Sequence, residues 1–358
     1  MMKSLLRPFM AAALLAATSV AAADVNLKAG HPDAYYVKKG DTLWDISNQF
    51  LDTPWQWPEL WHVNQEIDNP HLIYPGDVIR LVYVEGKPQL HVEREQEVHK
   101  LQADGSVVKL SPQAREVDPN EAIAAVPMSN IRHFLREGLV LSAEEIKQAP
   151  YVLAGEDGRV VYGRGDTVYG RDTVRNWSPI ASSYSVYRTG VRYIDPVTRK
   201  VLGYEARKVG MVSTSNQQDD LATFRIVESQ EAIRAEDRIL PAPAGRIRTV
   251  FHPSAPDQEI TANVVHFFDR IDGVALNDVL VINKGTEDGV MEGNLLDAVE
   301  VGRKVKDPVT NRQVQLPNTV IGSVILFRVF DKVSYALVVR SEKPIRQDAL
   351  FTNPYGSL

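Results

Sequence analysis

One constant spacing constrains the fold of this chain more than any other feature, because two stretches after residue 149 align at an offset of 112 residues. Residues 195–198 read Asp-Pro-Val-Thr and recur at residues 307–310, and 307 − 195 = 112. The same offset relates Asp157 to Asp269, Asp166 to Asp278, Gly190 to Gly302, Gly210 to Gly322, Val227 to Val339, Ser229 to Ser341 and Ile233-Arg234 to Ile345-Arg346. A single duplication of this length indicates two related domains rather than a solenoid.

The duplicated units have the composition of β-sheets. Runs of β-branched and aromatic residues in the second unit predict strands at residues 279–282, 320–330 and 334–339. Gly, Asp and Pro interrupt these runs at short intervals, as is typical of sheets or small barrels. We expect a connector with some secondary structure at residues 85–148, a first β-rich unit at residues 149–245 and a second at residues 246–358.

The first residues have the pattern of a secretory signal. Lys3 and Arg7 precede a run of small and apolar residues, and three alanines before Asp24 form an Ala-x-Ala cleavage site. The run is too short and too rich in alanine for a membrane span. We therefore expect a cleavable signal peptide at residues 1–23 and a periplasmic protein.

Composition and motifs argue against most catalytic classes. The chain has no cysteine, which excludes a cysteine nucleophile, and its net charge of −6 without a basic run argues against nucleic acid as a partner. Its eight histidines form no metal-binding pattern, and there is no Gly-x-Ser-x-Gly motif. The sequence predicts no enzyme, no metal and no cofactor, although a pair of carboxylates for glycan cleavage stays open as an alternative.

Residues 35–84 follow the order strand, helix, helix, strand. The runs at residues 35–39 and 77–82 predict the strands, and Thr42 with Asp45 predicts a capping box for the first helix. The expected buried face of that helix comprises Leu43, Trp44, Ile46, Ser47 and Phe50. Pro58 suits the first turn of a second helix that continues through Leu60, Trp61 and Asn64.

Three motifs in this stretch, Gly-Asp-Thr-Leu-Trp at residues 40–44, Asn64 and Tyr-Pro-Gly-Asp at residues 74–77, resemble the LysM module. LysM modules bind glycans that contain N-acetylglucosamine, such as peptidoglycan or chitin. The resemblance implies a shallow groove in which backbone groups bind the acetamide and apolar side chains cover its methyl group. The implied glycan-binding residues are Gly40, Asp41, Thr42 and Leu43 on one wall and Leu72, Ile73, Tyr74 and Pro75 on the other.

Two alternatives stay open within this module. The side chains of Leu43 and Ile73 either line the groove or pack in the core. The Trp-rich segment at residues 51–57 either extends the binding surface or supplies the aromatic area that so small a unit needs for stability.

The remaining chain resembles a second family. Residues 149–152, 165–169 and 187–188, together with Asp-Pro-Val-Thr and residues 202–206, are similar to secretin-associated proteins of the type IV pilus (the TsaP family) and to the C-terminal region of the flagellar assembly protein FlgT. The resemblance implies a periplasmic protein that binds peptidoglycan and associates with the outer-membrane secretin ring, as an oligomer around it. A peptidoglycan-remodelling enzyme or activator and a flagellar basal-body component are the alternatives. The predicted fold class is α+β, with a small βααβ module, a connector and two related β-rich units.

Overall fold

The computed structural model describes residues 27–57, 60, 73–84, 87–93, 131, 134, 138–174, 183–241, 253–268 and 272–354 of the 358-residue chain. The predicted signal peptide and most of the predicted connector lie outside these residues. Within them, no helix combines the length and the apolar character that crossing a membrane requires.

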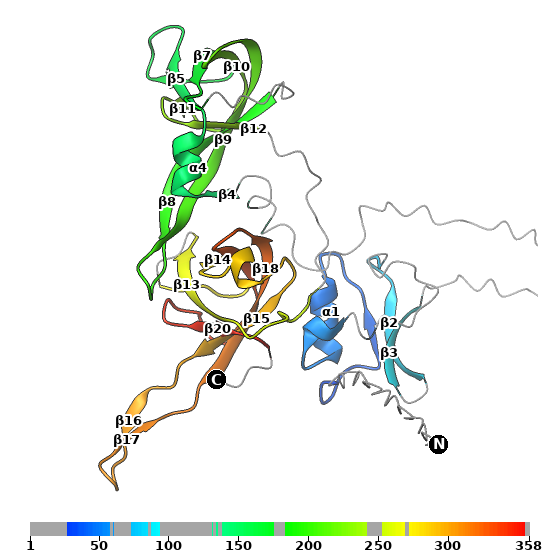
Figure 1. The fold of residues 1–358 in the computed structure, drawn as a ribbon. Coiled ribbons are helices and arrows are strands. Elements are labelled where there is room, and N and C mark those ends of the chain that lie inside the picture. The colour runs from blue at the N-terminus through cyan, green and yellow to red at the C-terminus, as the bar shows by residue number, and fades with distance from the viewer. Residues whose placement is uncertain are drawn as a thin grey trace, which may run out of the picture.

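The predicted α+β class is wrong, because the protein is mostly β. Strands account for 52% of the described residues and helices for 9%. The α-helices of the described part are α1 (Leu43–Phe50) in the N-terminal unit and the short α4 (Ala143–Gln148). An α+β fold needs helices that cover a sheet. Here the two C-terminal units bury their strands against other strands instead (Figure 1).

The N-terminal unit is a three-stranded antiparallel sheet packed against α1. Its strands are β1 (Ala34–Tyr36), β2 (Val78–Val84) and β3 (Lys87–Glu93), in the order β1-β2-β3, and the 3₁₀-helix η1 (Pro54–Gln56) follows α1. β3 pairs with β2 along its whole length, although its residues fall within the predicted connector. Leu90 of β3 is fully buried in the core of this unit, so β3 is part of the same sheet.

Local sequence determines α1 as predicted. The Thr42 hydroxyl accepts a hydrogen bond from the Asp45 N–H at 3.1 Å, and the Asp45 carboxylate accepts one from the Thr42 N–H at 3.0 Å. This capping box is the predicted one, and all five residues of the predicted apolar face are buried. Trp57 and Leu60 are helical, whereas Pro58, Trp61 and Asn64 of the predicted second helix lie outside the described residues.

The first C-terminal unit is a ring of six strands. The strands involved are β5 (Tyr151–Gly155), β7 (Thr167–Arg171), β8 (Ser183–Ile194), β9 (Val201–Gln218), β10 (Leu221–Ser229) and β12 (Arg238–Pro241). They pair in the order β10-β7-β5-β12-β8-β9, and β9 pairs again with β10 to close the ring. β4 (Gly138–Leu141) adds to the free part of β9, and β6 (Val161–Tyr162) pairs with β11 (Ile233–Arg234).

The second C-terminal unit is a closed six-stranded barrel. Its strands are β13 (Thr261–Phe267), β14 (Val279–Ile282), β15 (Leu295–Glu300), β18 (Thr319–Val329), β19 (Ser334–Ser341) and β20 (Leu350–Thr352). They pair in the order β13-β14-β19-β18-β15-β20. β14, β18 and β19 cover the three strands predicted from the sequence. A separate hairpin, β16 (Lys304–Lys306) with β17 (Gln313–Gln315), projects from the barrel at the lower left of Figure 1.

The two rings have the same strand order at the 112-residue offset. β5, β7, β10, β9, β8 and β12 correspond to β13, β14, β19, β18, β15 and β20, and the six pairings of one ring recur in the other. The pairing of Tyr162 with Ile233 also recurs, as an isolated bridge between Val274 and Ile345. The unit boundaries at residues 149–245 and 246–358 stay a prediction.

Alternating side chains of the barrel strands build two apolar clusters, because successive residues of a strand point to opposite faces. One cluster fills the barrel interior and includes Leu280 and Phe351. The other lies on the opposite face of the same strands, with Val281 and Tyr335 at its centre. Trp44 of α1 and Tyr193 of β8 are buried in this second cluster, so all three units meet there.

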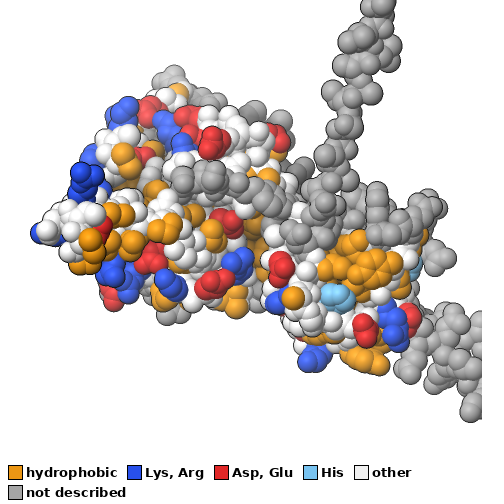
Figure 2. Space-filling model, turned by 90° about the horizontal axis from the view of Figure 1, so that it is seen from below, with side chains coloured by type: hydrophobic (Ala, Val, Ile, Leu, Met, Phe, Trp, Pro, Cys, Tyr) orange, Lys and Arg blue, Asp and Glu red, His pale blue; other side chains and the backbone are white. Residues whose placement is uncertain are grey.

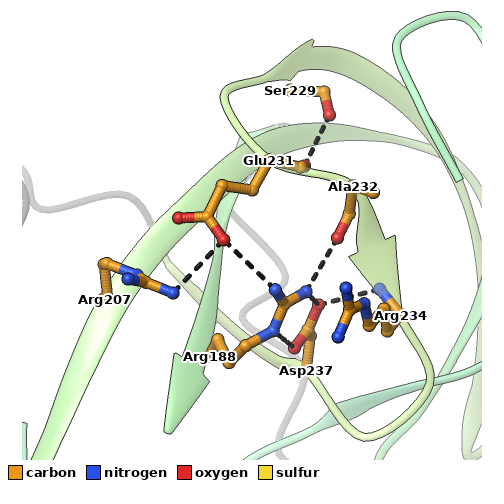
Figure 3. A network of polar contacts seen from close by, with 7 residues as sticks. All are labelled: Arg188, Arg207, Ser229, Glu231, Ala232, Arg234 and Asp237. Carbon is orange, nitrogen blue, oxygen red and sulfur yellow. Dashed lines mark hydrogen bonds and ion pairs between the residues drawn. The ribbon is translucent and has the colours of Figure 1, made fainter. Parts of the chain in front are cut away.

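A buried ion pair ties β8 to the turn before β12 in the first unit (Figure 3). Arg188 donates through Nε and Nη2 to the two carboxylate oxygens of Asp237 at 3.0 and 2.8 Å, and through Nη2 to the Ala232 carbonyl at 2.7 Å. Asp237 also accepts the Arg234 N–H at 2.8 Å. Glu231 accepts a further hydrogen bond from Arg188 Nη1 at 3.3 Å, but its side chain is 41% exposed. The side chains of Arg188 and Asp237 are 20% and 5% exposed, so Asp237 is the main buried counter-charge of the guanidinium.

Replacing Asp237 with Ala should lower the free energy of unfolding by about 3 kcal/mol, because the largely buried Arg188 guanidinium would keep only the more exposed Glu231 as its counter-charge. Urea unfolding followed by circular dichroism measures the loss. The matched control is Glu300→Ala, which removes the ion pair with Lys343 at the position of Arg188 in the second unit. That pair is solvent-exposed, so its loss should leave the midpoint unchanged. Equal effects of the two substitutions would contradict this explanation.

Candidate glycan-binding site

Backbone hydrogen bonds bring two turns of the N-terminal unit side by side. The Val37 N–H donates to the Asp77 carbonyl at 2.9 Å, and the Val37 carbonyl accepts the Gly76 N–H at 2.8 Å. The turn between β1 and α1 therefore lies beside the turn that leads into β2. These are the two predicted walls of the groove, at residues 40–43 and 72–75.

Asp41 organises the first turn. One of its carboxylate oxygens accepts the Lys38 N–H at 2.8 Å and the Tyr35 hydroxyl at 2.9 Å. Gly40 precedes it with φ +98°, a left-handed conformation that favours glycine. Gly40 is exposed and Asp41 is half-buried, so this turn presents both its backbone and a charged group to solvent.

Asp77 organises the second turn in the same way. Its carboxylate accepts the Tyr74 N–H at 3.0 Å, and its own N–H donates to the Tyr74 carbonyl at 3.0 Å. Gly76, with φ +96°, supplies the left-handed residue of the turn. Asp77 was not among the predicted site residues. The carboxylate after Pro-Gly is the signal that identifies it, since such a side chain stabilises a turn through its own backbone neighbours.

The predicted wall residues divide by exposure. Leu43 and Ile73 are fully buried in the core of the unit, and Thr42 and Tyr74 are nearly so. Gly40, Asp41 and Pro75 remain accessible, and Leu72 lies outside the described residues. With the side chains of Thr42, Leu43, Ile73 and Tyr74 buried, the two turns present mainly backbone groups and the half-buried Asp41 carboxylate, which suits the amide of an acetamido sugar. The assignment of these eight residues to glycan binding stays a prediction.

The aromatic residues of this unit mainly stabilise the fold. Trp57 is fully buried in the core beside Leu43 and Phe50, which favours the packing alternative for this part of the Trp-rich segment. Trp44 is buried in the cluster that it shares with Tyr193 and Tyr335, away from the core of its own unit. Trp57, from the segment that the sequence offered as extra binding surface, and Trp44, from the apolar face of α1, are thus both buried in the protein interior.

Tyr35 has an unusual environment within the first turn. Burial, together with the hydrogen bond to Asp41 and the negative charges of Asp41 and Asp45, raises the pKa of Tyr35 to about 12. The phenol therefore stays neutral and keeps donating to Asp41 at any physiological pH. This hydrogen bond holds the turn, and hence the first wall, in one conformation.

The comparisons with known proteins define this unit. Residues 35–82 match the LysM domain. A segment of 60 residues is 37% identical to "Uncharacterized protein YqbP" of Bacillus subtilis (strain 168), and the match covers 14% of this chain and 27% of that protein. The chain thus spans about a quarter of the relative's length. Both matches are short, and the resemblance to pilus and flagellar proteins stays a prediction.

A LysM domain is a binding module for peptidoglycan and related glycans and is not catalytic. Such a module indicates association with the cell wall. Among the residues that the structure describes, no group of three or more His, Asp or Glu side chains is placed to hold a metal ion.

Replacing Tyr35 with Phe should change the pH dependence of stability in the alkaline range. The unfolded chain ionises Tyr35 near pH 10, whereas the folded chain keeps it neutral to about pH 12. The stability that the raised pKa contributes is present below pH 10 and is lost between pH 10 and 12. Across that window the wild type should lose on the order of 1 kcal/mol relative to Tyr35→Phe, with solvent screening allowed for.

Urea unfolding of both proteins at a series of pH values measures this difference. Every other tyrosine is common to the two proteins, so their ionisation cancels in the comparison. A difference in stability that stays constant from neutral pH to pH 12 would contradict the role given to Tyr35.

Proposed function

We propose that this protein is a non-enzymatic periplasmic component of the cell envelope that binds peptidoglycan through residues 35–84. It anchors an envelope-spanning assembly, the type IV pilus secretin, to the cell wall. The observation that carries the proposal is the LysM match at residues 35–82, whose two turns are held together by the backbone hydrogen bonds of Val37. The signal-peptide pattern at residues 1–23 supports the location.

The binding step uses the two turns around Gly40 and Pro75. A single shallow groove that offers backbone groups gives modest affinity. Several copies held by one ring-shaped partner would raise the overall avidity without any new contact, because each further binding event becomes intramolecular. Weak binding by each module and strong binding by the assembly suit an anchoring protein. Single modules can dissociate from the wall and rebind while the assembly as a whole stays attached.

The two β-rings supply the part of the chain that would bind a protein partner. They fill more than half of the sequence and carry no glycan motif. Exposed apolar side chains occur on both units, including Val160, Val191, Val309 and Val320. Together with the resemblance to secretin-associated proteins, these surfaces support a role in protein association rather than in catalysis.

Purified peptidoglycan sacculi should sediment the protein but not a truncated protein that begins after Glu93. The truncation is placed after Glu93 because β3 completes the sheet of the LysM module. A truncation before β3 would keep that strand without its partner β2. Within the full chain, Asp41→Ala should weaken binding severalfold, as the loss of about 1 kcal/mol of hydrogen bonding loosens the first wall.

Arg80→Ala is the matched control for this experiment, because Arg80 is an exposed charged residue of the same module that bonds to Glu93 instead of to either turn. It should sediment like the wild type. Equal sedimentation of the full and truncated proteins would refute the site. Release of soluble muropeptides from the sacculi by the pure protein would instead support the alternative of a peptidoglycan-remodelling enzyme.

Affinity purification from detergent-solubilised envelopes should recover an outer-membrane secretin together with the protein. Asp41→Ala should leave this recovery intact, because the partner surface is assigned to the β-rings. Recovery of flagellar basal-body proteins in place of a secretin would support the flagellar alternative. Loss of the secretin on mutation of Asp41 in a folded protein would show that wall binding and partner binding are not separate.

A further inference from the structure

The hairpin formed by β8 and β9 is inserted against the second unit. Tyr193, near its tip, is fully buried, and its hydroxyl lies 3.3 Å from that of Tyr335 on β19. At the turn itself, Asn283 donates through Nδ2 to the Asp195 carboxylate at 2.9 Å. His266 on β13 also contacts the hairpin, with its ring centroid 5.9 Å from that of Tyr193. The tip of one unit is thus held by the outer face of the next.

The second unit carries the counterpart of this hairpin in β16 and β17. Asp307 accepts the Val309 N–H at 2.8 Å, just as Asp195 accepts the Val197 N–H at 2.8 Å in the first hairpin. The residue after the Thr of each Asp-Pro-Val-Thr motif is left-handed, with φ 60° at Arg199. The two tips therefore have the same local structure at an offset of 112 residues.

The second hairpin differs from the first in having no unit to receive it within the described part of the chain. It projects away from the barrel, on the side opposite to the first unit (Figure 1). Most of its residues are exposed, and Figure 2 shows it at the left edge with basic and apolar side chains exposed together. Arg303, Lys304, Lys306 and Arg312 supply the basic groups.

The β16–β17 hairpin keeps the apolar positions of the β8–β9 hairpin. Tyr193 and Leu202, which pack in the shared cluster, correspond at the offset of 112 to Val305 and Val314. These two valines are direct cross-strand partners, so they form one apolar patch on the hairpin. A patch of this kind on a two-stranded ribbon needs a partner surface, because an isolated hairpin is marginally stable in water.

The receiving face also has a counterpart, on β7 and β10 of the first unit. Val281 and Asn283 correspond at the same offset to Tyr169 and Arg171. Tyr169 is 37% exposed, and the Arg171 guanidinium lies at the surface beside Asp220. The Asp195–Asn283 contact would be replaced there by Asp307 against Arg171, which is a pair of opposite charges.

We propose that the β16–β17 hairpin of one copy docks on the β7–β10 face of the first unit in a second copy. The contact repeats between molecules the arrangement that already joins the two units within one chain. It is head to tail, so it propagates and gives a ring if the rotation closes or a filament if it does not. The proposal rests on the repeat and its internal contact, and it is independent of glycan binding.

Cross-linking tests the geometry directly, because the chain has no cysteine of its own. A Val309→Cys protein is mixed with a Leu221→Cys protein and treated with a short bis-maleimide. Leu221 is exposed and pairs with Arg171 across β10 and β7. A cross-linked dimer is expected from this mixture and not from Val309→Cys mixed with Val160→Cys, which places a thiol at an even more exposed position elsewhere on the first unit. Equal yields from the two mixtures, or none from either, would overturn the proposal.

Sedimentation velocity of the full chain tests the energetics. A contact between one hairpin and one sheet face is small, so it should produce concentration-dependent association at about 10–100 μM. Val305→Asp combined with Val314→Asp should weaken it at least about tenfold, because unpaired carboxylates would be buried in the contact. Val309→Asp is the matched control. Its counterpart Val197 stays 70% exposed in the β8–β9 hairpin, so Val309 is expected to stay outside the contact.

Two results of the sedimentation experiment would contradict the proposed contact. Association of the double variant like the wild type, or a wild type that stays monomeric over this range, would overturn the proposal. Circular dichroism shows whether the variants are folded, which is expected because the substituted residues lie on a projecting hairpin. Sacculus sedimentation should be unchanged in all of them, so failure here leaves the wall-binding proposal standing.

Discussion

The burial of Tyr193 against Tyr335 is the contact on which the arrangement of the C-terminal half depends. It places the tip of one strand pair in an apolar cluster on the next unit, with the two hydroxyls 3.3 Å apart. Burial raises the pKa of both phenols well above the ordinary value, so the pair remains uncharged and the desolvated contact keeps its hydrogen bond. Trp44 joins the same cluster and ties the LysM module to it.

Duplication has preserved the backbone more closely than the charges. Arg188 and Glu231 in the first unit correspond to Glu300 and Lys343 in the second, so an ion pair persists with its signs exchanged. Asp237, which accepts the hydrogen bonds of Arg188 in the first unit, corresponds to Ala349 at the offset of 112 residues. A cavity of about 220 Å³ lies at this place in the second unit, lined by Glu300, Val301, Ile321, Lys343, Pro344, Arg346, Asp348 and Ala349. The strand pairings tolerate this change because they are made by backbone groups, which every residue type except proline supplies in full.

Local patterns predicted the elements whose causes are local. The capping box of Thr42 and Asp45, the apolar face of α1 and the strands β14, β18 and β19 all follow from residues within one turn or one strand. The closing pair of β9 with β10 and the addition of β3 to the LysM sheet were not predicted, because they depend on how distant segments meet. The overestimate of helix in the fold class has the same origin, since a pattern read in one small module says nothing of how the larger units bury their strands.

The candidate site and the two hairpins show where sequence stops and tertiary structure decides. Sequence alone determined the turns, since Pro-Gly-Asp and Asp-Pro-Val-Thr carry their own hydrogen-bond acceptors, and a left-handed residue lies within the first motif and directly after the second. It could not determine that Leu43 and Ile73 turn into the core while Gly40 and Pro75 stay at the surface. Nor could it tell that Asp195 is buried against Asn283 while Asp307, in the same turn, lies on an exposed hairpin. The physical reason is that a turn is stabilised by its neighbours in sequence, whereas its burial depends on a surface contributed by another unit.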